Sequence, residues 1–276
     1  MRRSFINQLF VVALIAAHVF MTACDKNPSG PDNKQQPALP PQSSMAMDLS
    51  DFNQALPKGQ AETNAPGLNY TTARVTVALI NLSVATILSV PTLTFVAALS
   101  QQPVLQSDGK FHWIFTVNDG SKSFKADLAG WVDVPTSEAV FEMRISTTGV
   151  IPALNNFLWY EGRAQLTNKT GYWEIYDALR PASPTKILRI DWQAPDQNNA
   201  TLELTAVEQG VPTFGDKVRY NVAGTTRTVQ HFDASANATV TITWDAVTKA
   251  GSITAPNYNN GNKACWDSQL NDVTCP

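Results

Sequence analysis

The chain lacks the features that mark several large functional classes. Its 20 basic and 23 acidic residues give a formal charge of −3, and like charges do not cluster. This balance excludes the basic surface of a general nucleic-acid binder. The sequence also lacks a Gly-x-Ser-x-Gly elbow, a His-Glu-x-x-His helix and a glycine-rich phosphate loop. We therefore expect a protein that is not an enzyme, needs no cofactor and binds no nucleic acid.

Histidine and cysteine are too sparse to favour a metal centre. His112 and His231 each fall in a predicted strand without an acidic or thiol partner at motif spacing, which is typical of structural histidines. Cys265 and Cys275 form an even pair, and in an oxidising compartment they predict a disulfide that closes a C-terminal loop. The alternative, a metal held by both thiolates, lacks further ligands nearby.

The N-terminal region has the pattern of a secretory signal. Arg2 and Arg3 precede an apolar run over 9–17, and small residues precede Cys24. The segment Met21-Thr22-Ala23-Cys24 resembles the lipobox of bacterial lipoproteins, with Met21 where Leu is usual.

The lipobox resemblance implies cleavage before Cys24, lipid attachment to that residue and a folded domain outside the cytoplasm, anchored to a membrane of the bacterial cell envelope. The alternatives are an ordinary secretory signal with an incidental cysteine and a lasting transmembrane helix, for which the apolar run is short.

Composition divides the chain into three parts. Residues 1–23 form the signal peptide, and residues 24–66 are rich in Pro, Gln, Asn, Ser and Gly. Such a segment buries little apolar surface, so we expect a flexible tether, with one short helical turn over 45–52. Residues 67–276 are expected to form a single β-rich domain of about 210 residues with the C-terminal disulfide loop.

No charged residue occurs between Val75 and Ser107. The stretch predicts an apolar helix over 71–88, a break at Pro91 and a second helix over 91–100. A membrane span is disfavoured by the scattered hydroxyl residues and by Arg74, which would lie on the outer side. A buried β-hairpin is the remaining alternative, because Val, Ile and Thr are abundant.

From Lys110 onward the apolar residues recur with a period of two, and turn signals separate the runs. This pattern predicts an antiparallel meander of about eleven strands. The predicted strands cover residues 111–117, 123–133, 139–147, 157–167, 171–178, 186–193, 200–208, 217–223, 226–232, 239–244 and 251–255.

One face of the predicted sheet is apolar and the other is polar. The expected core-facing residues are Phe141, Met143, Ile145, Trp173, Ile175, Leu188, Ile190, Trp192, Leu202, Leu204, Val240, Ile242 and Trp244. We expect the sheet to curve around the apolar helix and hide both surfaces. Such a half-barrel resembles, in architecture alone, the periplasmic lipoprotein carriers and their outer-membrane receptor.

Two groups of residues are candidates for a site. Glu161 and Glu174 on adjacent strands could form the acid/base pair of a glycan-active enzyme, although a solvated face with ion pairs is the favoured interpretation. Trp131, Trp159 and Trp266 are candidate rim aromatics that could meet a sugar or an apolar ligand, although simple packing at the rim is the favoured interpretation.

Three functions follow, in order of preference. The first is a structural or protein-interaction module of the envelope, whose partners are the membrane and an envelope protein. The second is a half-barrel that binds a lipid or another apolar ligand. The third is a glycan-active enzyme that uses the sheet carboxylates.

Overall fold

The computed structural model describes residues 35–52 and 67–276, except residues 120 and 197. Two short 3₁₀ helices, η2 (Gln42–Ser44) and η3 (Ser50–Phe52), precede the long helix α2 (Leu68–Leu99). A third, η4 (Asn259–Gly261), lies near the C-terminus. The strands are β1 (Val104–Leu105), β2 (Phe111–Asp119), β3 (Lys122–Asp133), β4 (Glu138–Thr148), β5 (Phe157–Gln165), β6 (Thr170–Tyr176), β7 (Lys186–Asp196), β8 (Asn199–Ala206), β9 (Lys217–Ala223), β10 (Thr226–Asp233), β11 (Ala238–Asp245), β12 (Gly251–Thr254), β13 (Ala264–Trp266) and β14 (Asp272–Val273).

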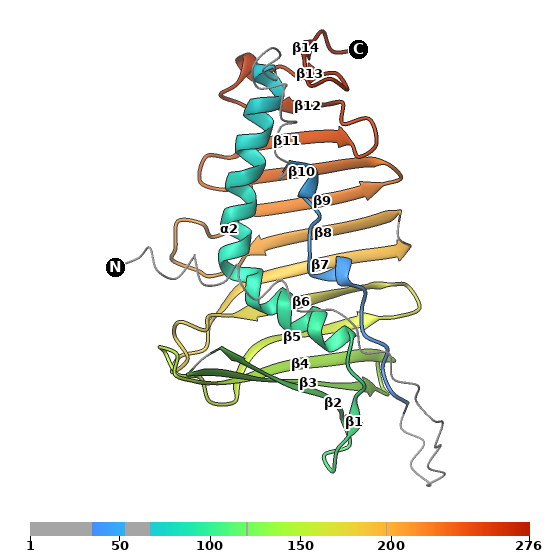
Figure 1. The fold of residues 1–276 in the computed structure, drawn as a ribbon, viewed down its shortest axis with the longest axis vertical. Helices are drawn as coiled ribbons and strands as arrows, with labels where there is room; N and C mark the ends of the chain where they lie inside the picture. Colours follow the sequence, from blue (N-terminus) through green and yellow to red (C-terminus); the bar gives the residue numbers. More distant parts are fainter. Residues whose placement is uncertain (1–34, 53–66, 120, 197) are drawn as a thin grey trace. The chain divides into compact units, whose positions relative to one another are not determined.

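The fourteen strands form one antiparallel meander in which each strand pairs with its neighbours in sequence (Figure 1). Strands β1 and β14 are the two edges, so the sheet does not close into a barrel. The predicted fold class, mainly β with an apolar N-terminal helix, is confirmed. The eleven predicted strands correspond to β2 through β12. Strands β1, β13 and β14 were not predicted; they contain only two or three residues each.

Helix α2 is continuous, so the predicted break at Pro91 is wrong. Pro91 lies buried inside the helix, whose axis changes direction toward its C-terminal end (Figure 1). A proline removes one backbone hydrogen bond and kinks a helix without ending it when packing holds the turns on both sides. Here Leu88 and Phe95 are buried on either side of Pro91. Tertiary packing therefore overrides the local stop signal.

The predicted apolar face of the sheet is its inner face, which packs against α2. Of the residues expected to face the core, all are buried except Val240, which is half-buried. The opposite, outer face carries the polar residues that alternate with them, as a one-sided sheet requires.

Large aromatic side chains of the inner face lie over glycines on the neighbouring strand. Trp173 pairs in register with Gly162, and Trp192 pairs with Gly171. A Cβ atom added at Gly162 would lie 2.4 Å from Cε3 of Trp173. The rings thus occupy the space of the missing side chains, which allows close packing of a face rich in tryptophan.

Residues 37–52, which we call the inner strap, do not behave as the flexible tether that composition predicted. Pro37, Ser44, Met45, Leu49 and Phe52 are buried. The strap runs over the inner face beside α2 (Figure 1), and η2 contacts β7 and β8. The predicted helical turn over 45–52 corresponds to η3. Residues 24–34 and 53–66 of the predicted tether, like the predicted signal peptide, lie outside the described residues.

The inner strap and α2 run in opposite directions and contact each other near both ends of α2. The hydroxyl of Thr92 donates to the carbonyl oxygen of Met45 at 3.4 Å. The ring of Phe52 stacks on Tyr70, with centroids 5.8 Å apart, and meets Trp244 edge-on at 4.8 Å. The strap therefore joins helix and sheet into one hydrophobic core.

We expect Phe52→Ala to lower the free energy of unfolding by about 3 kcal/mol or more, because it removes a buried aromatic ring and leaves a cavity. Urea unfolding followed by tryptophan fluorescence measures the change. Phe214→Ala is the matched control: Phe214 is 49% exposed, so its loss should cost under about 1 kcal/mol. Equal effects of the two variants would contradict a docked strap.

Candidate functional site

The inner face of the sheet is the first candidate for a ligand site. Indole N–H and phenol hydroxyl groups of its aromatic residues form hydrogen bonds with the inner strap. Nε1 of Trp173, on β6, donates to the hydroxyl of Ser44 at 3.3 Å. Nε1 of Trp244, on β11, donates to the Asp51 carboxylate at 2.8 Å. Buried indole groups need such partners, and the strap supplies them.

A tyrosine on β9 makes a third contact of this kind. The hydroxyl of Tyr220 donates to the carbonyl oxygen of Asp48 at 2.8 Å. Burial raises the pKa of Tyr220 to about 12, so the hydroxyl remains a neutral donor across the physiological range. The strap is therefore fixed to β6, β9 and β11 by side chains that depend on it for hydrogen bonds.

At the centre of this face, side chains of the strap, the helix and the sheet pack together and are buried from solvent. Met45, Phe95 and Trp173 are each at most 1% exposed, and the rings of Phe95 and Trp173 lie 5.2 Å apart. Two buried polar atoms, Nε1 of Trp192 and the hydroxyl of Tyr160, have no hydrogen-bond partner among the described residues. The protein itself thus occupies the surface that a carrier would offer to a ligand.

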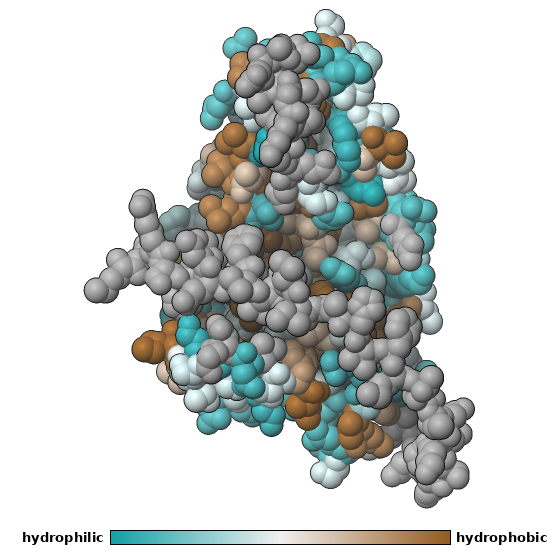
Figure 2. Space-filling view, in the orientation of Figure 1, coloured by the Kyte–Doolittle hydropathy of each residue, from teal (hydrophilic) through white to brown (hydrophobic). Residues whose placement is uncertain are grey.

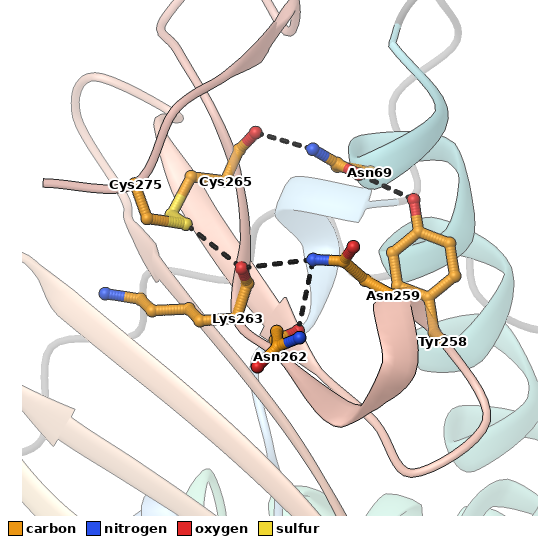
Figure 3. The surroundings of a disulfide bond; sticks show 7 residues. All are labelled: Asn69, Tyr258, Asn259, Asn262, Lys263, Cys265 and Cys275. Carbon is orange, nitrogen blue, oxygen red and sulfur yellow. Dashed lines mark hydrogen bonds between the residues drawn. A yellow bond between two sulfur atoms is a disulfide. The ribbon is translucent and has the colours of Figure 1, made fainter.

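The predicted disulfide between Cys265 and Cys275 is confirmed, with the two Cα atoms 5.2 Å apart. Figure 3 shows the C-terminal loop beside the first turn of α2. The side-chain amide of Asn69 donates to the carbonyl oxygen of Cys265 at 2.8 Å and accepts from the Tyr258 hydroxyl at 2.6 Å. The loop is therefore connected to the start of the helix.

The same loop supplies the cap of α2. The Asp272 carboxylate accepts hydrogen bonds from the backbone N–H groups of Leu68, at 3.1 Å, and Asn69, at 2.9 Å. A carboxylate in this position satisfies helix N–H groups that otherwise lack partners and interacts favourably with the helix dipole. The cap is distant in sequence, so reading local residues could not identify it.

The three candidate rim tryptophans have different environments. The expectation for Trp266 is wrong: it is 2% exposed, packs edge-on against Tyr70 and lies opposite Gly251. Trp131 and Trp159 are half-buried. Nζ of Lys110 lies 3.7 Å from the ring centroid of Trp131, which gives a cation–π contact and not an open platform.

Glu161 and Glu174 lie directly opposite each other on β5 and β6, as the sequence predicted. Their carboxylates are neutralised by neighbours on the outer face. Lys186 binds Glu174 and lies 3.5 Å from Glu161, and Glu161 accepts a 2.6 Å hydrogen bond from Tyr176. Burial, followed by this hydrogen bond, raises the pKa of Tyr176 to about 12. The arrangement is a cross-strand ion-pair network.

A shallow, open depression of about 580 Å³ lies on the outer face. Its polar lining includes Arg163, Tyr172, Asp191, Glu203 and Arg219. Arg163 is already bound to Asp133 at 2.9 Å, and the guanidinium of Arg189 covers the ring of Tyr172 at 4.1 Å. The surface is therefore a solvated sheet face on which Arg163, Asp191 and Glu203 are already in ion pairs.

His112 has acidic partners that the sequence spacing did not reveal. Its Nδ1 lies 2.7 Å from the Asp127 carboxylate on β3, and its Nε2 lies 3.2 Å from that of Asp108. The ring is 9% exposed. His112 bridges the turn before β2 to β3, which is a structural role.

Among the described residues, no cluster of three or more His, Cys, Asp or Glu could hold a metal ion.

The helix presents a second surface, on the side away from the sheet. We call it the outer stripe of α2; it comprises Val75, Ala78, Leu79, Leu82, Ser83, Ala85, Thr86 and Leu93, all exposed. Leu79 is 63% and Leu82 60% exposed. Figure 2 shows apolar atoms gathered over the N-terminal half of α2. The expectation that the sheet would hide the whole helix is therefore wrong.

By length and composition α2 could cross a membrane: its most apolar 18-residue window has a mean hydropathy of 2.0, and 22% of that window is buried.

No family model, no curated protein and no solved structure matches the chain. The fold class is thus a single antiparallel meander covered on its apolar face by one helix and one strap.

We expect Asp272→Ala to lower the free energy of unfolding by about 1 to 2 kcal/mol, because two helix N–H groups lose their acceptor. Asp272→Asn should cost less, since it keeps one acceptor oxygen. Urea unfolding of both variants measures the difference. In the Cys265→Ser/Cys275→Ser background the effect of Asp272→Ala should shrink, because the open loop no longer positions the cap. An unchanged unfolding midpoint in Asp272→Ala would contradict this account.

Proposed function

We propose that the protein is a lipoprotein of the bacterial cell envelope that works as a non-enzymatic structural or interaction module. Cys24 carries the lipid anchor, and the folded domain lies outside the cytoplasm. The lipobox-type segment that ends in Cys24 supports the anchor. The disulfide between Cys265 and Cys275 fits an oxidising compartment.

The observation that carries the scaffold role is the filled inner face. Three aromatic residues of the sheet direct hydrogen bonds into the inner strap, and Phe95 of α2 is fully buried against Trp173. Removing the strap to admit a ligand would leave these donors without partners, at a cost of about 1 to 3 kcal/mol each. A permanently closed core therefore fits the geometry better than a carrier.

Lipid carriage remains the second candidate, and one specific feature favours it. Nε1 of Trp192 and the hydroxyl of Tyr160 are buried polar groups without a partner among the described residues, so they could bind the polar head of an apolar ligand. The third candidate, a glycan-active enzyme, has less support. Its carboxylates Glu161 and Glu174 are bound to Lys186 and Tyr176 on an open surface.

A fluorescent fatty acid distinguishes a scaffold from a carrier. We expect the mature protein to give no saturable increase in fluorescence, because the inner strap and α2 occupy the site. A fatty-acid carrier of known affinity is the positive control for the probe. Phe95→Ala removes a ring that is 0% exposed, and the cavity it leaves should bind benzene but not the larger fatty acid.

Saturable one-to-one binding by the wild-type protein would overturn the scaffold role and favour the carrier. The mass of the N-terminal peptide from the same preparation tests the anchor separately. A diacylglycerol adduct on Cys24 is expected, and an unmodified Cys24 would contradict the proposed attachment.

A further inference from the structure

We propose that the outer stripe of α2 rests on the surface of the bilayer to which the protein is anchored. This inference rests on the proposed lipid anchor and adds a second contact with the membrane. The partner is the lipid surface itself, at the level where headgroups meet acyl chains. A second copy of the chain and a protein partner are the competing occupants.

The chemistry of the outer stripe suits a medium that offers no hydrogen bonds. Its large side chains are aliphatic, and no residue from Val75 to Leu99 is charged. The hydroxyl of Thr86 donates to the carbonyl oxygen of Leu82 at 2.7 Å, and that of Ser83 donates to Ile80 at 2.8 Å. These hydroxyls are satisfied by the helix, so the stripe does not depend on water for them.

The length of chain before the domain favours a bilayer as the occupant. Pro37 is buried in the folded domain and lies only thirteen residues after Cys24. Fully extended, that chain spans at most about 45 Å, because each residue adds about 3.5 Å. Docking of the strap therefore shortens the tether, and the domain stays close to the membrane that holds the lipid. This proximity raises the effective concentration of the stripe at the bilayer surface.

The absence of charge also separates a bilayer from a protein partner. Protein interfaces carry polar rims that fix register and exclude wrong partners. Along α2 the nearest charged residue is Arg74, one position before Val75. By length and composition α2 is apolar enough for contact with a bilayer. Because basic residues are missing, the contact should depend on apolar area and not on anionic lipid.

The test uses the full mature protein with its lipid, reconstituted into phosphatidylcholine vesicles that contain brominated acyl chains. An environment-sensitive fluorophore is attached to Leu82→Cys in one sample and to Val134→Cys in the other. Val134 is 83% exposed, lies in the turn between β3 and β4, and serves as the matched control. We expect bromine quenching at position 82 to exceed that at position 134 by about threefold or more. Adding anionic lipid or salt should leave the quenching unchanged.

A charged variant provides the second measurement. In a Leu79→Glu/Leu82→Glu background, a fluorophore at Leu93→Cys should lose its quenching, while Val134→Glu should not affect it. Both leucines are more than half exposed, so the fold should tolerate the change. Circular dichroism checks this.

Three results would overturn the inference. A fluorophore at position 82 that remains in water excludes any occupant. A second copy is indicated if the fluorophore at position 82 is shielded from water but is not quenched by bromine, and if this shielding rises with protein concentration. A fluorophore that is shielded without quenching only when an envelope extract is added indicates a protein partner. If Cys24 carries lipid while position 82 stays in water, the proposed function stands and this inference alone fails.

Discussion

The whole structure depends on covering one apolar sheet face with residues that come from the N-terminal side of the chain. An antiparallel meander with a polar outer face cannot leave its inner face in water. The helix does not cover this face alone, because Met45, Leu49 and Phe52 are buried in the same core. Helix α2 and the inner strap share the task, and both precede the sheet in sequence. The core therefore forms between segments that are distant along the chain.

The need to cover this apolar face also explains how the inner strap and α2 are held in place. Indole and phenol groups on the inner face bring polar atoms into the core, and the strap satisfies three of them with Ser44, Asp48 and Asp51. The cross-strand glycines make room for the tryptophan rings. At the other end of the core, the disulfide loop places Asp272 on the first turn of α2. These contacts fix the position of the inner strap and the start of α2. A core held in this way fits a scaffold better than a carrier that opens.

Sequence patterns predicted the elements whose signals are local. The period-two alternation identified β2 through β12, and the uncharged stretch identified an apolar helix. The inner strap was missed because its composition is polar on average, although Met45, Leu49 and Phe52 recur at the spacing of one helix face. Pro91 indicated a break because local sequence does not report the packing of Leu88 and Phe95.

The same holds for the candidate site residues: those with a local sequence signal were predicted, and those that depend on tertiary contacts were not. The disulfide and the adjacency of Glu161 and Glu174 followed from spacing and strand order. The Asp272 cap and the carboxylates around His112 required tertiary structure. Trp266 was assigned to the rim because β13, which holds it, has only three residues and no visible alternation. Its burial follows from its pairing with Gly251 on β12.

The central claim is that the inner face is permanently covered by α2 and the inner strap. Native-state hydrogen exchange of the mature protein, with and without added fatty acid, tests this most directly. The account predicts that amides of the strap and of the buried stripe of α2 are protected nearly as well as those of the central strands, and that fatty acid changes nothing. Rapid exchange confined to the strap and α2, slowed by fatty acid, would contradict it and indicate a cover that opens for a ligand.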